Sequence, residues 1–116
     1  MPHIIYDKNI IEILVLFLLQ HGELYAYSIM KLISSLSEDT LSVMGGSLYP
    51  ILYKLKDKGY ITDRIEIIGK RQRMSRVYYN LTASGQEYLQ TLLADRAMIQ
   101  NSMEKIFKNA EGGVDS

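Results

Sequence analysis

The alternation of apolar and polar residues along the chain predicts four helices and one β-hairpin. Residues 8–20 are apolar on almost every side, which predicts a helix that is buried on more than one face. Residues 26–36 carry an apolar stripe at helical spacing, formed by Ala26, Ile29, Met30 and Ile33. A polar segment that contains glycine, residues 37–46, separates this helix from the next.

The third predicted helix has one apolar face and one face that mixes tyrosine with lysine. Ser47 is predicted to cap its start, with Pro50 at the third helical position and Gly59 as the stop. The spacing i, i+3, i+4, i+7 predicts a buried stripe of Leu48, Ile51, Leu52 and Leu55. The outward side then carries Tyr49, Tyr53, Lys54, Lys56 and Lys58. Hydroxylated aromatic rings and cations on one exposed helix face are suited to a phosphate backbone and the edges of bases.

Two β-rich runs, residues 61–68 and 74–81, are joined by a short basic segment, which predicts a hairpin. The tip of this hairpin carries Lys70, Arg71 and Arg73. Tyr78 and Tyr79 alternate across the second strand, so we assign them to packing, with one of the two in the core. A helix followed by a hairpin with a basic tip is the organisation of a winged helix-turn-helix.

Thr82 is predicted to cap a last helix that reaches about residue 110. Such a helix would be about 42 Å long, which exceeds what so small a domain can cover. It carries a heptad seam in which Arg96 is the one polar member, and the seam predicts pairing with a second copy of the chain. The seam consists of Leu89, Leu92, Arg96, Ile99, Met103, Ile106 and Ala110.

These elements predict a mainly α fold with a small β-hairpin. We expect a winged helix-turn-helix domain in residues 1–81, a dimerisation helix in residues 82–110 and a disordered tail in residues 111–116. Leu14 and Leu18 of the first helix are expected to join Leu89, Leu92, Ile99, Met103 and Ile106 in the dimer interface.

The formal net charge of the chain is zero, but the charge is unevenly distributed. Residues 54–76 hold eight basic and three acidic residues, a net charge of +5, whereas residues 1–53 have −3 and residues 77–116 have −2. The positive charge therefore lies on the predicted reading helix and wing, as expected for a nucleic-acid-binding surface.

Composition argues against several other classes of protein. The chain has no cysteine and its two histidines have no spaced partners, so we expect no enzyme, metal site or cofactor. No apolar run is long enough for a membrane span and the start does not resemble a signal peptide, so the expected location is the cytoplasm.

The motifs resemble those of PadR-family transcriptional regulators, of the short subfamily with one C-terminal dimerisation helix. The resemblance covers roughly residues 8–108, and the matching segments come in the family's order. They are residues 22–29, 46–55 (which include Gly-Ser-Leu-Tyr-Pro), 58–61 and 76–85 (which include Tyr-Tyr-Asn-Leu-Thr).

The resemblance implies a homodimer that binds a palindromic DNA operator and represses transcription until a small molecule releases it. It places DNA contacts at Ser47, Tyr49 and Lys54 on the helix and at Lys70, Arg71 and Arg73 on the wing. Tyr53 is added because it faces the same way and can reach a base edge.

Two positions depart from the family. Tyr25-Ala26 stands where the family usually has His-Gly, which affects the turn. Arg96 stands near the place where many relatives have a large aromatic residue at the dimer centre, and this chain has no tryptophan. Arg96 is therefore either a structural ion paired with Asp95 or Glu104 of the other copy, or part of a wet pocket that binds an acidic or polar effector.

Each functional interpretation has a simpler alternative. Tyr49 and Tyr53 could be ordinary half-buried helix residues, and a basic hairpin tip could serve solubility alone. A winged helix that makes only protein contacts is the alternative function, because the fold does not dictate the partner.

Overall fold

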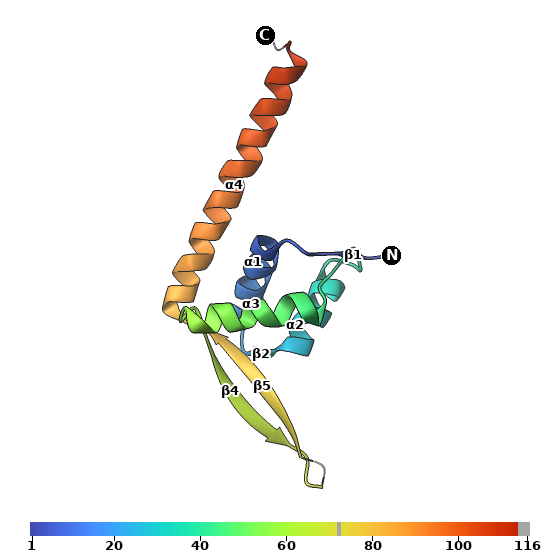
Figure 1. Cartoon of the computed structure of the whole chain (residues 1–116), viewed down its shortest axis with the longest axis vertical. Coiled ribbons are helices and arrows are strands. Elements are labelled where there is room, and N and C mark those ends of the chain that lie inside the picture. The colour runs from blue at the N-terminus through green and yellow to red at the C-terminus, as the bar shows by residue number, and fades with distance from the viewer. Residues whose placement is uncertain (72, 114–116) are drawn as a thin grey trace.

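The computed structural model describes residues 1–71 and 73–113, which form a small helical domain with one long projecting helix (Figure 1). The helices are α1 (Lys8–Leu19), α2 (Ala26–Leu36), α3 (Gly45–Asp57) and α4 (Ala83–Glu111). The strands are β1 (His3–Ile4), β2 (Leu24–Tyr25), β3 (Leu41–Ser42), β4 (Ile61–Ile68) and β5 (Met74–Leu81). The order of elements confirms the predicted winged helix with a long C-terminal helix.

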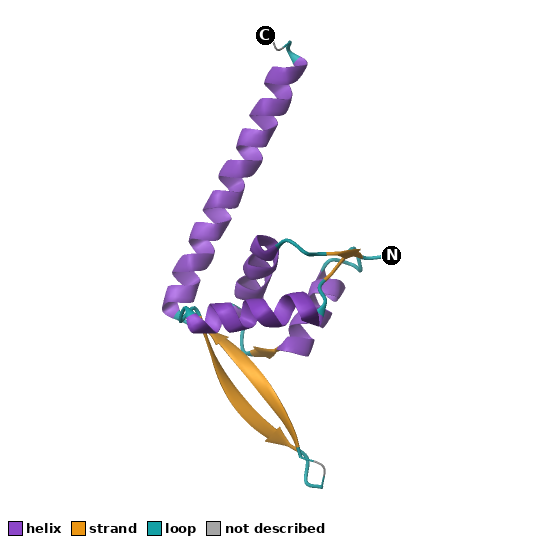
Figure 2. Ribbon diagram, viewed as in Figure 1, coloured by secondary structure: helices purple, strands orange, loops and turns teal. Residues whose placement is uncertain are grey.

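The hairpin of β4 and β5 has the predicted bounds and extends away from the helices (Figure 2). The two strands pair antiparallel from Ile61 opposite Leu81 to Ile68 opposite Met74, and β2 pairs with the inner end of β5. Tyr79 is buried in the core and Tyr78 is half-buried, so one of the two tyrosines is core as predicted. The outer half of the hairpin is mostly exposed.

The core lies where α1, α2, α3 and the base of the sheet meet. The predicted apolar stripe of α3 is fully or almost fully buried. α1 contributes residues from more than one of its sides, because it packs against α2, α3 and α4. These core side chains of α1 include Ile11, Ile13, Val15, Leu16 and Leu19.

The start of α4 is fixed to the turn that follows α3. Thr82 caps the helix as predicted, with its hydroxyl accepting a hydrogen bond from the Gly85 amide at 3.0 Å. The Thr82 amide donates to the Tyr60 carbonyl at 3.1 Å, and a Cβ at Gly85 would lie 2.0 Å from that carbonyl oxygen. Only glycine permits this close approach.

From this anchor α4 runs away from the domain, and the molecule measures 72 × 35 × 21 Å (Figure 1). It ends at Glu111, one residue into the predicted tail, and Gly112 is its C-cap. Residues 114–116 of that tail lie outside the described residues. Among the described residues, no helix is long and apolar enough to span a membrane.

Two further details differ from the sequence-based prediction. α1 ends at Leu19, one residue early, because Gln20 is already the C-cap. The short strands β1 and β3 pair in parallel, which ties the N-terminus to the connection between α2 and α3.

Candidate nucleic-acid interface

The start of α3 differs from the prediction. The helix begins at Gly45 with Met44 as N-cap, and no side chain caps it. The prediction that Ser47 is the N-cap is therefore wrong: Ser47 is the third residue of the helix and is half-buried. Pro50 is consequently the sixth residue of α3 rather than the third. Gly45 and Gly46, which the sequence places in the preceding polar segment, extend the helix by two residues at its start.

The predicted contact residues of α3 lie on two sides of the helix. Tyr49 and Tyr53 are exposed, 40% and 63% respectively, with their ring centroids 6.3 Å apart. Both line a hollow of about 320 Å3 between α3 and the sheet. Ser47 and Lys54 instead line a second hollow with Tyr6 and Lys8, next to the N-terminal segment.

The hollow beside Tyr49 and Tyr53, here called the helix–wing groove, has walls from β2, α2, α3, β4 and β5. β2 contributes Tyr25, α2 contributes Tyr27, and β5 contributes Ser75, Arg76 and Val77. The Arg76 guanidinium lies 4.6 Å from the centroid of the Tyr25 ring. On the α3 side, Lys56 Nζ lies 2.9 Å from the Asp63 carboxylate of β4. The groove thus combines phenol hydroxyls with cations.

Sequence reasoning missed Tyr25, Tyr27 and Arg76 as groove residues. The sequence indicates Tyr25 only as part of a turn and Arg76 only as part of a motif. One signal was available: Tyr25 is the N-cap of α2 and Tyr27 is its second residue, and a helix start is often placed beside the phosphate backbone in helix-turn-helix proteins. Their nearness to α3 follows from tertiary packing and not from local spacing.

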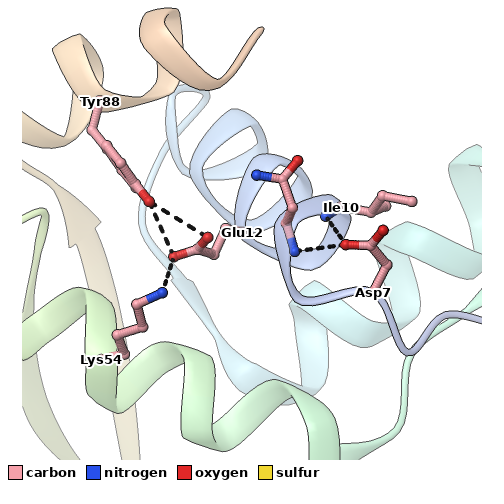
Figure 3. A network of polar contacts seen from close by, with 6 residues as sticks. Asp7, Ile10, Glu12, Lys54 and Tyr88 are labelled. Carbon is pink, nitrogen blue, oxygen red and sulfur yellow. Dashed lines mark hydrogen bonds and ion pairs between the residues drawn. The ribbon is translucent and has the colours of Figure 1, made fainter. Parts of the chain in front are cut away.

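Lys54 is exposed on α3, and its ammonium also contacts a buried acid (Figure 3). Lys54 Nζ lies 3.1 Å from Glu12 Oε1, and the Tyr88 hydroxyl lies 3.4 Å from the same oxygen. Hydrogen bonding to Glu12 raises the pKa of Lys54. Burial, followed by the negative charge of Glu12, raises the pKa of Tyr88. Lys54 of α3 therefore contacts α1 at Glu12, and Glu12 in turn contacts α4 at Tyr88.

The tip of the hairpin places its cations in solvent. Lys70, Arg71 and Arg73 are all exposed, while Gln72 lies outside the described residues. Exposed arginines on a hairpin tip suit phosphate contacts or insertion into a narrow minor groove.

The base of the hairpin is held by a polar cluster around Glu23. Its carboxylate accepts hydrogen bonds from Arg64 Nε and from Asn80 Nδ2, each at 2.7 Å. These two bonds, that of Arg64 first, lower the pKa of Glu23. The Arg64 guanidinium also lies 4.6 Å from the centroid of the Tyr78 ring. The cluster connects the turn before β2 to both strands of the wing.

The predicted dimer residues fall into two groups. Leu89 and Leu92 are buried in the core of their own chain, so they offer no surface to a partner, and their heptad spacing is explained by the contact with α1. Ile99, Met103 and Ile106 are 54%, 42% and 63% exposed on the projecting part of α4. Leu14 and Leu18 are half-buried and line an apolar hollow between α1 and α2.

Arg96 is exposed on α4, near the point where the helix leaves the domain. No group of three or more residues suited to hold a metal ion occurs among the described residues. All buried side-chain nitrogen and oxygen atoms in the same part of the chain have hydrogen-bond partners.

Comparisons with known proteins agree with this architecture. Residues 15–91 match the model of the transcriptional regulator PadR-like family. No curated protein matches the chain. A transcriptional regulator from Clostridium thermocellum is 23% identical, with a TM-score of 0.76 over 84% of this chain and 93% of that chain, and shows the likeness of fold.

Two more similar sequences are among the solved structures. A PadR-like transcription factor from Bacteroides fragilis is 30% identical, with a TM-score of 0.66 over 85% of this chain and 91% of that chain. Bacillus subtilis PadR, solved in complex with operator DNA, is 32% identical, with a TM-score of 0.66 over 75% of this chain and 48% of that chain. Family members regulate transcription and are not enzymes. The match of the family model to two thirds of the chain, on the same fold, shows that this protein belongs to the PadR-like family of transcriptional regulators.

Proposed function

We propose that the protein is a homodimeric repressor that binds a palindromic DNA operator through the helix–wing groove and the tip of the hairpin. The observation that carries the proposal is the composition of one continuous surface. Tyr49 and Tyr53 of α3, the tyrosines at the start of α2 and Arg76 of β5 line one groove, and the hairpin beside it ends in three exposed basic residues. The related B. subtilis PadR was solved with operator DNA, which supports a nucleic acid as the partner.

Each part of this surface supplies a different contact. Tyr49 and Tyr53 present hydroxyls and ring edges from a helix, the element that fits the major groove of DNA. Arg71 and Arg73 present cations that suit the phosphate backbone. Ser47 and Lys54 lie on the other side of α3, so in this proposal they contribute less than Tyr49 does.

The proposed dimer uses the projecting part of α4. Ile99, Met103 and Ile106 repeat at heptad spacing and are exposed in a single chain, and burying them against a second copy would remove apolar surface from water. Leu14 and Leu18 offer a second apolar surface beside α1. Arg96 lies at the start of this seam, and we propose that a wet site for an acidic or polar effector forms there in the dimer. Residues 1–81 would then bind DNA in the cytoplasm, and residues 82–110 would hold the two DNA-binding domains together.

The test is binding of the purified protein to DNA from upstream of its own gene. Tyr49→Ala is expected to weaken binding by about 1–3 kcal/mol per half-site while the helical circular-dichroism spectrum is retained. Tyr49→Phe serves as the matched variant, because it keeps the ring and removes only the hydroxyl. Unchanged affinity in a folded Tyr49→Ala variant would show that the helix–wing groove is not the DNA site, and would favour a surface for protein contacts.

A further inference from the structure

Glu12 is the one buried charged residue in the described part of the chain, and it lies where three helices meet. It belongs to α1 and is only 4% exposed. Its carboxylate receives the ammonium of Lys54 from α3 at 3.1 Å and the hydroxyl of Tyr88 from α4 at 3.4 and 3.5 Å. Figure 3 shows Tyr88 reaching this acid from above and Lys54 reaching it from below.

A buried carboxylate is costly unless its partners stay in place. Because the two partners here come from different helices, a change in the angle between α3 and α4 would separate Glu12 from at least one of them. The acid thus favours one arrangement of α3 against α4. A packed apolar contact at the same place would permit small sliding movements at lower cost.

A second set of contacts joins the same two helices next to Glu12. The Tyr88 ring stacks on Tyr60 in the turn after α3, with centroids 4.2 Å apart and an angle of 8° between the planes. The hydroxyls of Thr82 and Ser84 donate to the Gly59 carbonyl at 2.7 and 3.0 Å. Tyr88 therefore takes part in both sets, through its ring and through its hydroxyl.

We propose that Glu12 is a positioning residue that fixes the direction of the reading helix α3 relative to α4. Lys54 and Tyr88 act through it, so that α3 and the anchored part of α4 move as one body. The consequence for DNA rests on the proposed function: in a dimer joined through α4, this joint would set the separation and angle of the two reading helices. A signal that bends or shifts α4 would then reach α3 through Glu12.

The position of α3 relative to α4 can be tested without DNA. The chain has no cysteine, so two cysteines introduced by mutation can be labelled specifically. Gly46→Cys at the start of α3 and Lys108→Cys near the end of α4 provide two exposed positions for spin labels. The distance between the labels is measured by pulsed electron paramagnetic resonance, with labelled protein diluted into unlabelled protein so that each dimer carries one labelled copy. A single narrow distribution is expected in the parent.

Glu12→Gln and Tyr88→Phe are expected to broaden that distribution or shift its mean. Tyr88→Phe keeps the ring stack on Tyr60 and removes only the hydroxyl, so it keeps the test decisive if Glu12→Gln does not fold. Glu87→Gln is the matched control, because it neutralises an exposed glutamate beside Tyr88 and should leave the distribution unchanged. Parent-like distributions in the folded Glu12→Gln and Tyr88→Phe variants, or in Tyr88→Phe alone if Glu12→Gln does not fold, would overturn the proposal.

A second measurement tests the consequence for DNA. The protein's own upstream DNA is footprinted, and a derivative with one base pair inserted between the half-sites is prepared. Inserting one base pair changes both the separation and the rotation of the half-sites, so a rigid dimer should bind the derivative much less well. We define the spacing preference as the ratio of the affinity for the original DNA to the affinity for the lengthened DNA. In Tyr88→Phe this ratio is expected to fall by roughly 2- to 30-fold.

The two measurements separate the possible failures. If the parent binds its upstream DNA and Tyr88→Phe shows the same spacing preference, the role of Glu12 in setting the spacing is contradicted. A parent that binds none of its upstream DNA would contradict the proposed function, while the label distances would still decide whether Glu12 positions α3.

Discussion

The two parts of α4 show how one continuous helix meets two different environments. In its first part Leu89 and Leu92 are buried and Gly85 touches the Tyr60 carbonyl, so the helix belongs to the domain core. In its second part Ile99 and Ile106 have the same apolar character and the same spacing, yet both are more than half exposed. Apolar spacing along a helix therefore predicts that a face will be buried, but not by which chain.

The same comparison separates folding from assembly. The first part stabilises the single chain, because its contacts are complete within that chain. The second part adds little to the fold of one copy and leaves an exposed apolar seam, which supports the proposal that a partner covers it. Changes in the two parts should therefore affect different measurements.

The largest expected effect is that of Gly85→Ala in the anchored part. Its new methyl group would lie 2.0 Å from a backbone oxygen, which no side-chain rotation relieves. We expect a loss of about 3 kcal/mol or more in the free energy of unfolding, measured by urea denaturation. Gly46→Ala in α3 is the control, because a Cβ there meets nothing within 4 Å. A Gly85→Ala protein as stable as the parent would show that α4 is not anchored at this carbonyl.

An intermediate effect is expected for Ile99→Asp combined with Met103→Asp in the projecting part. Two carboxylates on the seam would lose hydration in a dimer but not in a single chain, so the dimer should dissociate while the fold remains. Sedimentation velocity should report half the parent mass at micromolar concentration, with an unchanged circular-dichroism spectrum. Thr91→Asp with Asn101→Asp adds the same charge to exposed polar positions of α4 and should leave the mass unchanged. A dimer that persists with both seam carboxylates would place the interface elsewhere.

The smallest effect concerns alkaline pH and the anchored part. Lys54 and Tyr88 have pKa values raised in the folded state above ordinary values of about 10. Each folded group holds its proton more tightly than the unfolded one, so its stabilisation is complete below about pH 10 and is lost as pH rises through the folded pKa. The melting temperature between pH 8 and pH 11 should therefore fall less steeply in Tyr88→Phe than in the parent. Equal slopes would mean that Tyr88 does not contribute to alkaline unfolding.

Local patterns predicted most of the fold. The hairpin strands, α2 and the Thr82 cap were predicted at their observed positions, because each depends on neighbouring residues. Met44 in place of Ser47 as the cap of α3 was not predictable from residue preference alone, because the two glycines continue the helix.

The candidate site was less predictable, because its partners come from distant segments. The sequence places Lys54 on α3, but its contact Glu12 lies 42 residues earlier on another helix, within a stretch that is apolar on almost every side. Tyr25 and Tyr27 reach the groove only through the packing of α2 beside α3 and β5. The outward-facing residues of a helix can be predicted from the sequence of that helix alone. The residues that line a groove between several elements cannot, because they are brought together by tertiary packing.

The most direct test of the account is the salt dependence of binding to the protein's own upstream DNA. The logarithm of the binding constant should fall linearly with the logarithm of salt concentration, because phosphate contacts release counterions. Arg71→Gln with Arg73→Gln should weaken binding to all DNA sequences about equally and lower the slope by about 2 or more per dimer, whereas Lys105→Gln with Lys108→Gln on α4 should leave it unchanged. A slope that does not change in the wing variant, or binding that does not depend on salt, would contradict the proposal that this winged helix binds DNA through its tip.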